Sequence, residues 1–344
     1  MQESLMEKNV NRENILLLNH HGLGEVMMSL PACRWLVQEC GERVWMTVAG
    51  DEEQICSDQR CGSHFVPFSI TNKRLYSKFK LIMKIRGLGI ESVVAFDGFD
   101  RAVVHKFSRL IGAKRFYCES VCDADIMDRN AVHKRFRYLQ NISVFLGKPV
   151  PPEIEDDYLL DACSRFHTDF LNIYGRYIVL VPGSGEMERF KRWPIDQFVD
   201  FSKLCNEKDP EIKLVITGTS NEYHLGNSIQ NEVHNSSVIN LCGKVSLKDL
   251  VPLYKQSMLV VGGDCGGLHL AKASGARIAV IIGPTNYAFT GPIEADIVMD
   301  RELPGTPWYC RENVKKKAYL TDEPSMKIPA ADLMKCIEDK GIFD

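Results

Sequence analysis

The feature that most constrains the fold is a series of short apolar runs, rich in β-branched residues, with helical periodicity between them. Three runs lie in the first part of the chain (ILLL, RVWMTV and SVVAF) and four in the second (YIVLV, KLVIT, SMLVV and IAVII). Such runs are typical of strands in parallel sheets that helices cover on both faces. The two series predict an α/β protein with two Rossmann-like domains and a cleft between them.

The segment between the two series, LGKPVPPEIEDDYLLD, is rich in proline and acid and has no clear period, so it is the predicted linker. A length of 344 residues also favours two domains. We expect an N-terminal Rossmann-like domain over residues 1–150 and a C-terminal one over 151–330. Apolar residues at helical spacing predict a terminal helix in 331–344. Packing of this helix back on the N-terminal domain is one arrangement that we consider.

The composition is that of a soluble globular protein, with 45% hydrophobic and 25% charged residues. No apolar run approaches the ~20 residues of a membrane span, and the polar N-terminus is unlike a signal peptide. The 12 cysteines are scattered without a CxxC pair, which favours reduced thiols over a disulfide framework or a zinc site. We therefore expect a cytoplasmic protein.

The stretch ILLLNHHGLGEVMMSLPACRWL has the pattern of a strand, a glycine turn and a helix. Such a turn can present N–H groups to a phosphate, and Asp51 follows the next strand as a ribose-binding acid would. However, Met27 replaces the third glycine of a dinucleotide fingerprint, and Glu25 would repel a pyrophosphate, so NAD is disfavoured. Two interpretations remain: a turn without chemistry, or a general base that the helix dipole keeps ionised.

Two motifs of the second half end strands in glycine turns. In VLVPGSGEMERFKRWP, the N–H groups around Gly183 and the hydroxyl of Ser184 could bind a phosphate, with Lys191 as a nearby positive charge. A surface loop with a solvated lysine explains the same pattern. In LVITGTSNEYHL, Glu222 begins a helix at the place where such sheets bind ribose hydroxyls. A favourable charge at a helix start is the simpler explanation.

The most specific motif is LVVGGDCGGLHLAKASG, in which Asp264 and Cys265 follow a buried strand. Gly266 and Gly267 then let the backbone contact a ligand, and the helix start supplies N–H donors to a diphosphate. A buried structural histidine is the usual explanation for a residue such as His269. Its position one turn into a helix behind a glycine loop favours a functional role.

Taken in this order, the motifs resemble glycosyltransferase family 9, the ADP-heptose:lipopolysaccharide heptosyltransferases. The similarity covers most of the chain and is strongest in LCGKVSLKDLVPLYKQSMLVVGGDCGGLHLAKASGARIAVIIGPT. It implies the GT-B fold, in which two Rossmann-like domains face each other across a central cleft, the first binding mainly the acceptor and the second the nucleotide sugar. It also implies an inverting enzyme without a metal or other cofactor, whose co-substrate is the nucleotide sugar.

The resemblance implies catalytic roles for Glu25, which stands where the family has a catalytic aspartate, and for Lys191, which would neutralise the diphosphate. The extra methylene of Glu25 moves its carboxylate by about 1.5 Å. The implied donor-binding residues are Gly183, Ser184, Lys191, Glu222, Asp264, Cys265, Gly266, Gly267 and His269.

The charge of the chain is unevenly divided. Residues 1–150 hold 21 Lys and Arg against 17 Asp and Glu, whereas residues 151–344 hold 21 against 28. Each basic run alone is explained by a solvated helix face. Together, KRLYSKFKLIMKIRG and HKRFR favour a patch that faces a phosphorylated glycolipid or the inner leaflet of a membrane. The predicted acceptor-binding residues are Lys73, Arg74, Lys134, Arg135 and Arg137.

The sequence thus predicts transfer of a heptose or related sugar from a nucleotide sugar, with ADP-heptose as the first candidate, to a lipopolysaccharide core or similar glycan. No nucleic-acid partner is expected. Two alternatives remain open. One is a nucleotide-sugar epimerase of the same architecture, which needs no acceptor. The other is a non-catalytic relative that binds a sugar nucleotide or a glycolipid.

Overall fold

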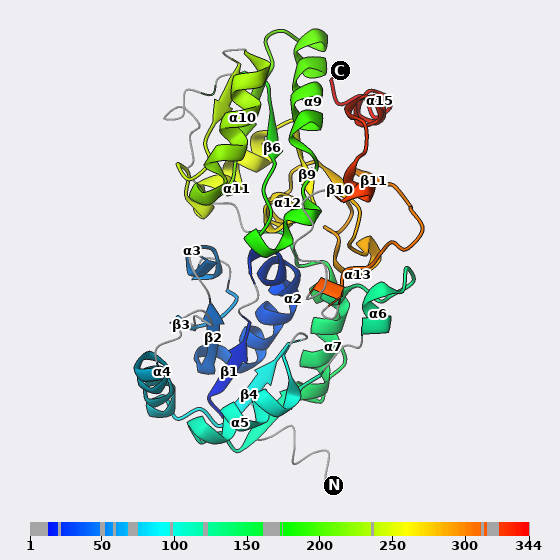
Figure 1. Cartoon of the computed structure of the whole chain (residues 1–344). Helices are drawn as coiled ribbons and strands as arrows, with labels where there is room; N and C mark the ends of the chain where they lie inside the picture. The colour runs from blue at the N-terminus through cyan, green and yellow to red at the C-terminus, as the bar shows by residue number, and fades with distance from the viewer. Residues whose placement is uncertain are drawn as a thin grey trace. The chain divides into compact units, whose positions relative to one another are not determined.

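A computed structural model describes residues 13–19, 22–48, 52–57, 60–67, 75–96, 99–119, 123–160, 173, 175–234, 237–310, 313–314 and 323–343. The chain divides into two compact units (Figure 1). The first comprises Met1–Cys122 and Val132–Asp161, and the second comprises Asp123–Ala131 and Ala162–Asp344. No helix in the described ranges is long and apolar enough to cross a membrane.

The first unit contains a five-stranded parallel sheet with the order β3-β2-β1-β4-β5. Leu17 of the central strand lies beside Met46 on one side and Val94 on the other. The strand order reverses between β1 and β4, because β2 and β3 extend the sheet on the opposite side of β1. The strands are β1 (Ile15–Leu18), β2 (Val44–Val48), β3 (His64–Pro67), β4 (Ser92–Ala95) and β5 (Arg115–Cys118).

Helices cover both faces of this sheet. The helices pack in two pairs: α4 packs beside α5, and α2 packs along α7. Ile85, Val104 and Ile111 join strand residues such as Leu16 and Val93 in the core. The helical segments are α2 (Leu23–Cys40), η1 (Gly41–Arg43), α3 (Glu53–Cys56), α4 (Leu75–Gly87), α5 (Arg101–Ile111), α7 (Lys134–Leu146) and α8 (Pro152–Glu155).

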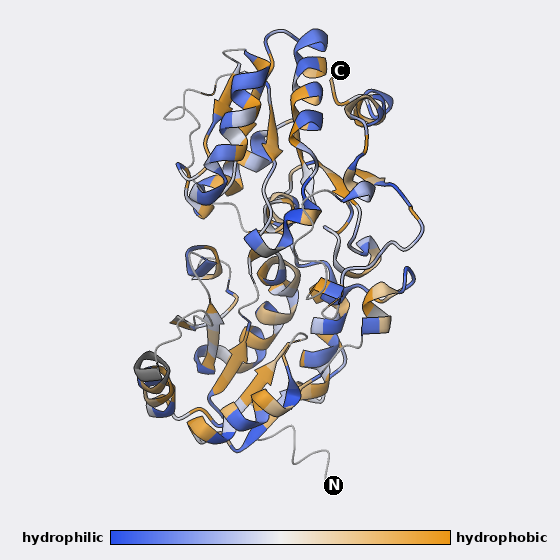
Figure 2. Ribbon diagram, in the orientation of Figure 1, coloured by the Kyte–Doolittle hydropathy of each residue, from blue (hydrophilic) through white to orange (hydrophobic). Residues whose placement is uncertain are grey.

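The second unit contains a six-stranded parallel sheet with the order β11-β10-β9-β6-β7-β8. Val179 of β6 pairs with Val260 of β9, and the strand order reverses between these two strands. Its strands are largely apolar, as expected for a sheet buried on both faces (Figure 2). They are β6 (Tyr177–Val181), β7 (Lys213–Ile216), β8 (Val238–Asn240), β9 (Leu259–Gly263), β10 (Ile278–Ile282) and β11 (Ile297–Asp300).

The helical segments of the second unit begin with α6, which comes from the first half of the chain. The segments are α6 (Asp123–Met127), η5 (Glu186–Lys191), α9 (Ile195–Lys208), η6 (Ser220–Glu222), α10 (Tyr223–Val233), α11 (Leu247–Gln256), α12 (Gly266–Ala273), α13 (Tyr287–Thr290), η7 (Pro324–Met326) and α15 (Ala330–Asp339).

The boundary between the units differs from the predicted one at residue 150. The predicted linker contains α8, which packs on α2 with Ile154 buried, and Arg34 binds the carboxylate of Asp157 at 2.6 Å. These contacts keep the chain in the first unit as far as Asp161. The segment 123–131 belongs to the second unit instead, because Asn286 donates to the carbonyl oxygens of Ile126 and Asp128.

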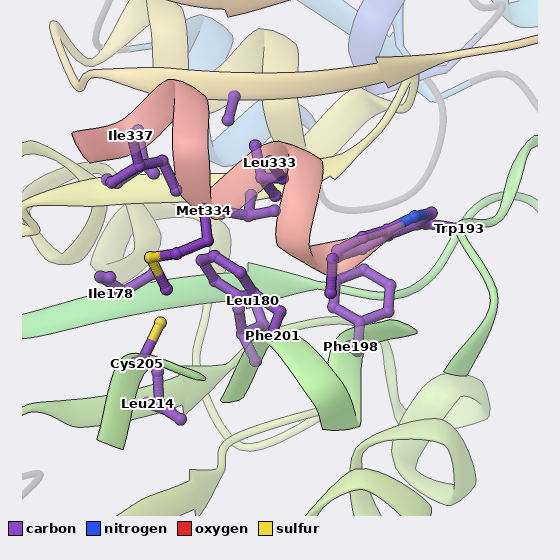
Figure 3. Close-up of a cluster of buried hydrophobic side chains, with 14 of the residues drawn as sticks. Ile178, Leu180, Trp193, Phe198, Phe201, Cys205, Leu214, Leu333, Met334 and Ile337 are labelled. Carbon is purple, nitrogen blue, oxygen red and sulfur yellow. The ribbon is translucent and has the colours of Figure 1, made fainter. Parts of the chain in front are cut away.

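The terminal helix is also placed differently from the arrangement considered above. The predicted helix is present as α15, but its apolar face packs on α9 and the sheet of the second unit, not on the N-terminal domain. Figure 3 shows Leu333, Met334 and Ile337 beside Phe201 and Leu180. The helix is amphipathic, and this contact buries its apolar residues within the second unit.

Candidate active site

The glycine motifs of the second unit meet where its strand order reverses. Because β6 and β9 are parallel neighbours, the loop that follows Val181 and the one that follows Gly263 leave the sheet at the same edge. Open α/β sheets bind ligands at such a reversal of strand order. The fold therefore brings together the two glycine motifs, although they are far apart in the sequence.

Two glycines in these motifs are required by close packing. A Cβ atom on Gly183 would lie 2.0 Å from Oε1 of Glu222, and one on Gly263 would lie 2.3 Å from the carbonyl oxygen of Lys191. A larger residue at Gly263 would displace the loop, because the contact there is with backbone, whereas a larger residue at Gly183 would displace the Glu222 carboxylate. The glycines thus set the loops against each other and place Lys191 beside the end of β9.

Lys191 is held in a buried cluster of charged and aromatic groups. Its ammonium lies 3.1 Å from Oε2 of Glu188 and 4.0 Å from the ring centroid of Tyr309, whose hydroxyl donates to Oε1 of Glu188. Burial by itself lowers the pKa of Lys191, but the negative charges of Glu188 and Asp264 outweigh it, so the pKa is raised. Lys191 is therefore a permanently charged group and not a solvated surface lysine.

Asp264 and His269 form a second buried pair next to this cluster. Nε2 of His269 lies 3.4 Å from Oδ1 of Asp264, and both residues are less than a tenth exposed. Burial raises the pKa of Asp264, whereas the hydrogen bond from His269 and the charge of Lys191 lower it. The lowering effects are together larger than the effect of burial, so the pKa of Asp264 is below its usual value. Asp264 is thus an anion, and His269 connects the first turns of α12 to the end of β9.

Ser184 is engaged within its own loop. Its hydroxyl donates to the carbonyl oxygen of Glu188 at 2.8 Å and accepts from Nε of Arg192 at 3.2 Å. Arg192 also donates to the carbonyl oxygen of Ser184, and burial lowers the pKa of its guanidinium. Ser184 therefore stabilises the loop in this structure, and its predicted bond to a phosphate stays a prediction.

Glu222 begins the helical segment after β7, as the sequence predicts. Its Oε2 accepts from the N–H of Thr219 at 2.8 Å and from the Thr219 hydroxyl at 2.9 Å, which completes a capping box. The simpler explanation, a carboxylate that stabilises a helix start, is therefore shown. The other oxygen, Oε1, faces Gly183 of the candidate phosphate loop, and ribose binding by Glu222 stays a prediction.

Cys265, Gly266 and Gly267 form the start of α12. Cys265 is the N-cap residue and makes no side-chain capping bond. Burial raises the pKa of its thiol to about 12, so the thiol is neutral at physiological pH. Gly267 packs on Val181, since an added Cβ would lie 2.9 Å from Cγ1 of that residue. The first turn of α12 is thus close to the end of β6, and the N–H groups of Gly267 and Leu268 point toward the Cys265 thiol.

In the first unit Glu25 lies in the first turn of α2, just after the strand where that sheet reverses its order. Its Oε1 accepts from Nζ of Lys134 at 2.6 Å, and its Oε2 accepts from the hydroxyl of Tyr138. The Glu25 side chain is 21% exposed. The lysine and the tyrosine thus contact different oxygens of the same carboxylate.

Of the predicted acceptor-binding residues, the three that the structure describes do not form one exposed patch, and their role in acceptor binding stays a prediction. Lys134 faces Glu25, and the guanidinium of Arg135 is buried 5.1 Å from the ring centroid of Tyr158. Burial removes Arg135 from the predicted basic surface. Arg137 is half-buried. Lys73 and Arg74 lie outside the described residues.

Four residues of these clusters were not predicted: Tyr138, Glu188, Arg192 and Tyr309. Glu188 and Arg192 lie inside the motif VLVPGSGEMERFKRWP, so the sequence already places both charges close to Lys191. Tyr138 is 113 residues from Glu25, and Tyr309 is 121 residues from Glu188. No local pattern connects residues at such separations.

The sequence profile of glycosyltransferase family 9 (heptosyltransferase) matches residues 101–318. The chain belongs to this family. The matched range contains every predicted donor-binding residue of the second unit, whereas Glu25 precedes it. In family terms, the two parallel sheets are the Rossmann-like units of a GT-B glycosyltransferase.

Known relatives agree with this assignment. Lipooligosaccharide heptosyltransferase 2 of Haemophilus influenzae is 26% identical over 141 residues, and the match covers 40% of each chain. The match thus spans less than half the length of this curated relative. A family 9 glycosyltransferase structure from Veillonella parvula has a TM-score of 0.75 at 17% identity, covering 96% of this chain and 98% of that one. The structure of ADP-heptose lps heptosyltransferase II of E. coli has a TM-score of 0.68 at 16% identity, covering 95% of this chain and 98% of that one.

Proposed function

We propose that the chain is an inverting, metal-independent glycosyltransferase of the cytoplasm. It moves a heptose or related sugar from a nucleotide sugar, with ADP-heptose as the proposed donor, to a lipopolysaccharide core or similar glycan. The observation that carries this proposal is the buried cluster of Lys191, Asp264 and His269 at the strand reversal of the second sheet. It supports the proposal because a permanent cation beside glycine loops is suited to a diphosphate.

In the proposed donor site, Lys191 and the N–H groups of Gly266 and Gly267 bind the diphosphate. Ser184 contributes its hydroxyl, Glu222 binds the ribose and Asp264 contacts the transferred sugar. As the bond between the anomeric carbon and the diphosphate oxygen breaks, negative charge develops on the leaving group. Lys191 and the start of α12 stabilise that charge, which is the role of a metal ion in other transferases.

In the proposed acceptor site, Glu25 is the general base. It takes the proton of an acceptor hydroxyl while the oxygen attacks the anomeric carbon from the face opposite the leaving diphosphate, which inverts the configuration. The contacts from Lys134 and Tyr138 support this role, because they hold the carboxylate from two sides and favour its ionised form.

The donor is identified by thermal shift with ADP-, UDP-, GDP- and CDP-sugars, since a ligand that binds the folded state stabilises it. We expect the largest shift with an ADP-sugar. With that donor and a phosphorylated core glycan, the product should form in EDTA and carry the inverted anomeric configuration.

Each alternative gives a different result in the same assay. A changed donor sugar in the absence of acceptor would indicate an epimerase. Donor binding without turnover on any acceptor would indicate a non-catalytic relative. Activity that EDTA abolishes and Mg²⁺ or Mn²⁺ restores would contradict metal independence. In the described ranges of the structure, no three His, Cys, Asp or Glu residues form a group that could hold a metal ion.

A further inference from the structure

The outward faces of α4 and α5 in the first unit carry large exposed apolar side chains. Phe79 and Met83 of α4 are 62% and 50% exposed, and Val103 and Leu110 of α5 are 62% and 46% exposed. Residues four or seven positions apart lie on the same face of a helix. Each helix therefore presents an apolar pair to solvent, and apolar and polar residues alternate along both helices (Figure 2).

The fold of the first unit does not need these side chains for its core. Each helix already buries a different face against the sheet, with Ile85 of α4 and Val104 and Ile111 of α5 almost fully inaccessible. The two helices also pack beside each other, so their outward residues belong to one side of the sheet. Exposed apolar groups that serve no internal packing indicate an interaction surface.

Within the two helices the charged residues are all of one sign, although the carboxylate of Asp100 caps the start of α5. Between Leu75 and Gly87, and again between Arg101 and Ile111, the sequence contains no Asp or Glu. Five exposed basic residues form no ion pair with any residue that the structure describes. They are Lys80, Lys84, Arg86, Lys106 and Arg109. Such a surface is complementary to a partner that is both anionic and apolar.

We propose that this face, the outward side of α4 and α5, lies on an anionic lipid bilayer. Phe79, Met83, Val103 and Leu110 enter the boundary between headgroups and acyl chains, while the basic side chains contact lipid phosphates. A soluble phosphorylated glycan would satisfy the charges but would leave the apolar residues in water. An anionic bilayer contacts both the basic and the apolar side chains, and for this reason we propose a bilayer as the partner.

Two separate exposed apolar residues of the same unit provide the matched control. Val132, just before α7, and Val144 within it are 59% and 53% exposed. The basic residues of α7 are otherwise engaged, since Lys134 binds Glu25 and Arg135 is buried. These two valines therefore have comparable apolar exposure without comparable exposed positive charge beside them, and we expect them to contribute little to binding of an anionic bilayer.

The test is sedimentation of the full chain with vesicles of phosphatidylcholine alone or mixed with phosphatidylglycerol. We expect binding only to the anionic vesicles, and weaker binding at high salt. The combined variant Phe79→Ser/Met83→Ser/Val103→Ser/Leu110→Ser should weaken binding at least about tenfold. Lys80→Glu/Lys84→Glu should weaken it by about fivefold or more for each charge. Val132→Ser/Val144→Ser should bind as the wild type does.

Three results would overturn the proposal: no preference of the wild type for anionic vesicles, equal losses in the α7 control, or concentration-dependent self-association that the α4 and α5 variants abolish. The last result would assign the face to a second copy of the chain. Circular dichroism and the thermal shift with nucleotide sugar verify that each variant is folded. Lipid binding is measured without turnover, so its failure is distinguishable from a failure of the proposed transferase activity.

Discussion

The two units contain the same three residue types in similar contacts. In the first, Lys134 and Tyr138 hold Glu25, and in the second, Glu188 and Tyr309 hold Lys191. In both clusters the tyrosine hydroxyl donates to the glutamate, and the ammonium lies near the tyrosine ring. A glutamate, a lysine and a tyrosine thus meet beside the strand reversal of each sheet.

The surroundings give the two clusters opposite properties. The ammonium of Lys191 lies 4.0 Å from its ring centroid and has a second carboxylate, Asp264, nearby, whereas that of Lys134 lies 5.7 Å from its ring centroid. The second cluster therefore stabilises a buried cation. In the first cluster, Glu25 lies in the first turn of α2, where the helix dipole favours a negative charge. We therefore expect neighbouring backbone and charges, and not the residue types alone, to decide which member of each cluster takes part in chemistry.

The largest expected effect concerns Glu25. If its carboxylate is the base, Glu25→Gln should lower turnover by about 10²–10⁴ while donor affinity stays near that of the wild type. Glu25→Asp is the matched variant, because it keeps the charge and shortens the side chain. A severe loss in Glu25→Asp would show that Lys134 and Tyr138 are positioned for the longer residue. Turnover of Glu25→Gln at the wild-type rate would remove Glu25 from catalysis.

A smaller effect is expected from Tyr138→Phe. The substitution removes the hydrogen bond to Oε2 of Glu25 but keeps the ring that packs on Phe96. A hydrogen bond to a charged group contributes about 1.5 kcal/mol or more, so we expect turnover to fall about tenfold. Tyr177→Phe is the control, since it removes a buried hydroxyl that donates to the carbonyl oxygen of Leu253, away from both clusters. Equal losses in the two variants would show that Tyr138 acts only through stability.

The smallest expected effect is a gain, in donor affinity, and not a loss. Glu188 neutralises Lys191 and would repel an incoming diphosphate, whereas Glu188→Gln keeps a side chain that can accept from Tyr309. We expect the dissociation constant of the donor to fall about fivefold, because one nearby negative charge is removed. Calorimetric titration of wild type and variant measures this change. Weaker donor binding by Glu188→Gln would show that the carboxylate contributes to the site instead of opposing the ligand.

Much of the fold could be predicted from the sequence, and the strands that were missed share a physical cause. All seven predicted runs contain strands, and the four missed strands, β3, β5, β8 and β11, are the edges of the two sheets. Edge strands are covered less completely and need fewer apolar residues; β5 and β11, for example, are mostly half-buried or exposed. The apolar-run criterion therefore finds the interior of a parallel sheet and not its margins.

The candidate site was predictable where a local motif determines it. Lys191, Asp264 and His269 belong to glycine motifs, and the structure brings them together. The basic run HKRFR stays a predicted acceptor site, but its side chains do not share one direction, for a geometric reason. Successive residues of a helix point about 100° apart, so Lys134 turns to Glu25 while Arg135 turns into the protein. Which direction each takes depends on packing against α2, which the run itself does not contain.

The division of roles between the two clusters is tested most directly by titrating ADP into the wild type, Lys191→Ala and Glu25→Gln side by side. A charge-assisted contact with phosphate contributes about 1.5–3 kcal/mol, so the account predicts that Lys191→Ala binds ADP at least about tenfold more weakly. Glu25→Gln should bind as the wild type does, and thermal unfolding verifies that both variants are folded. Unchanged affinity in Lys191→Ala, or an equal loss in both variants, would contradict the account.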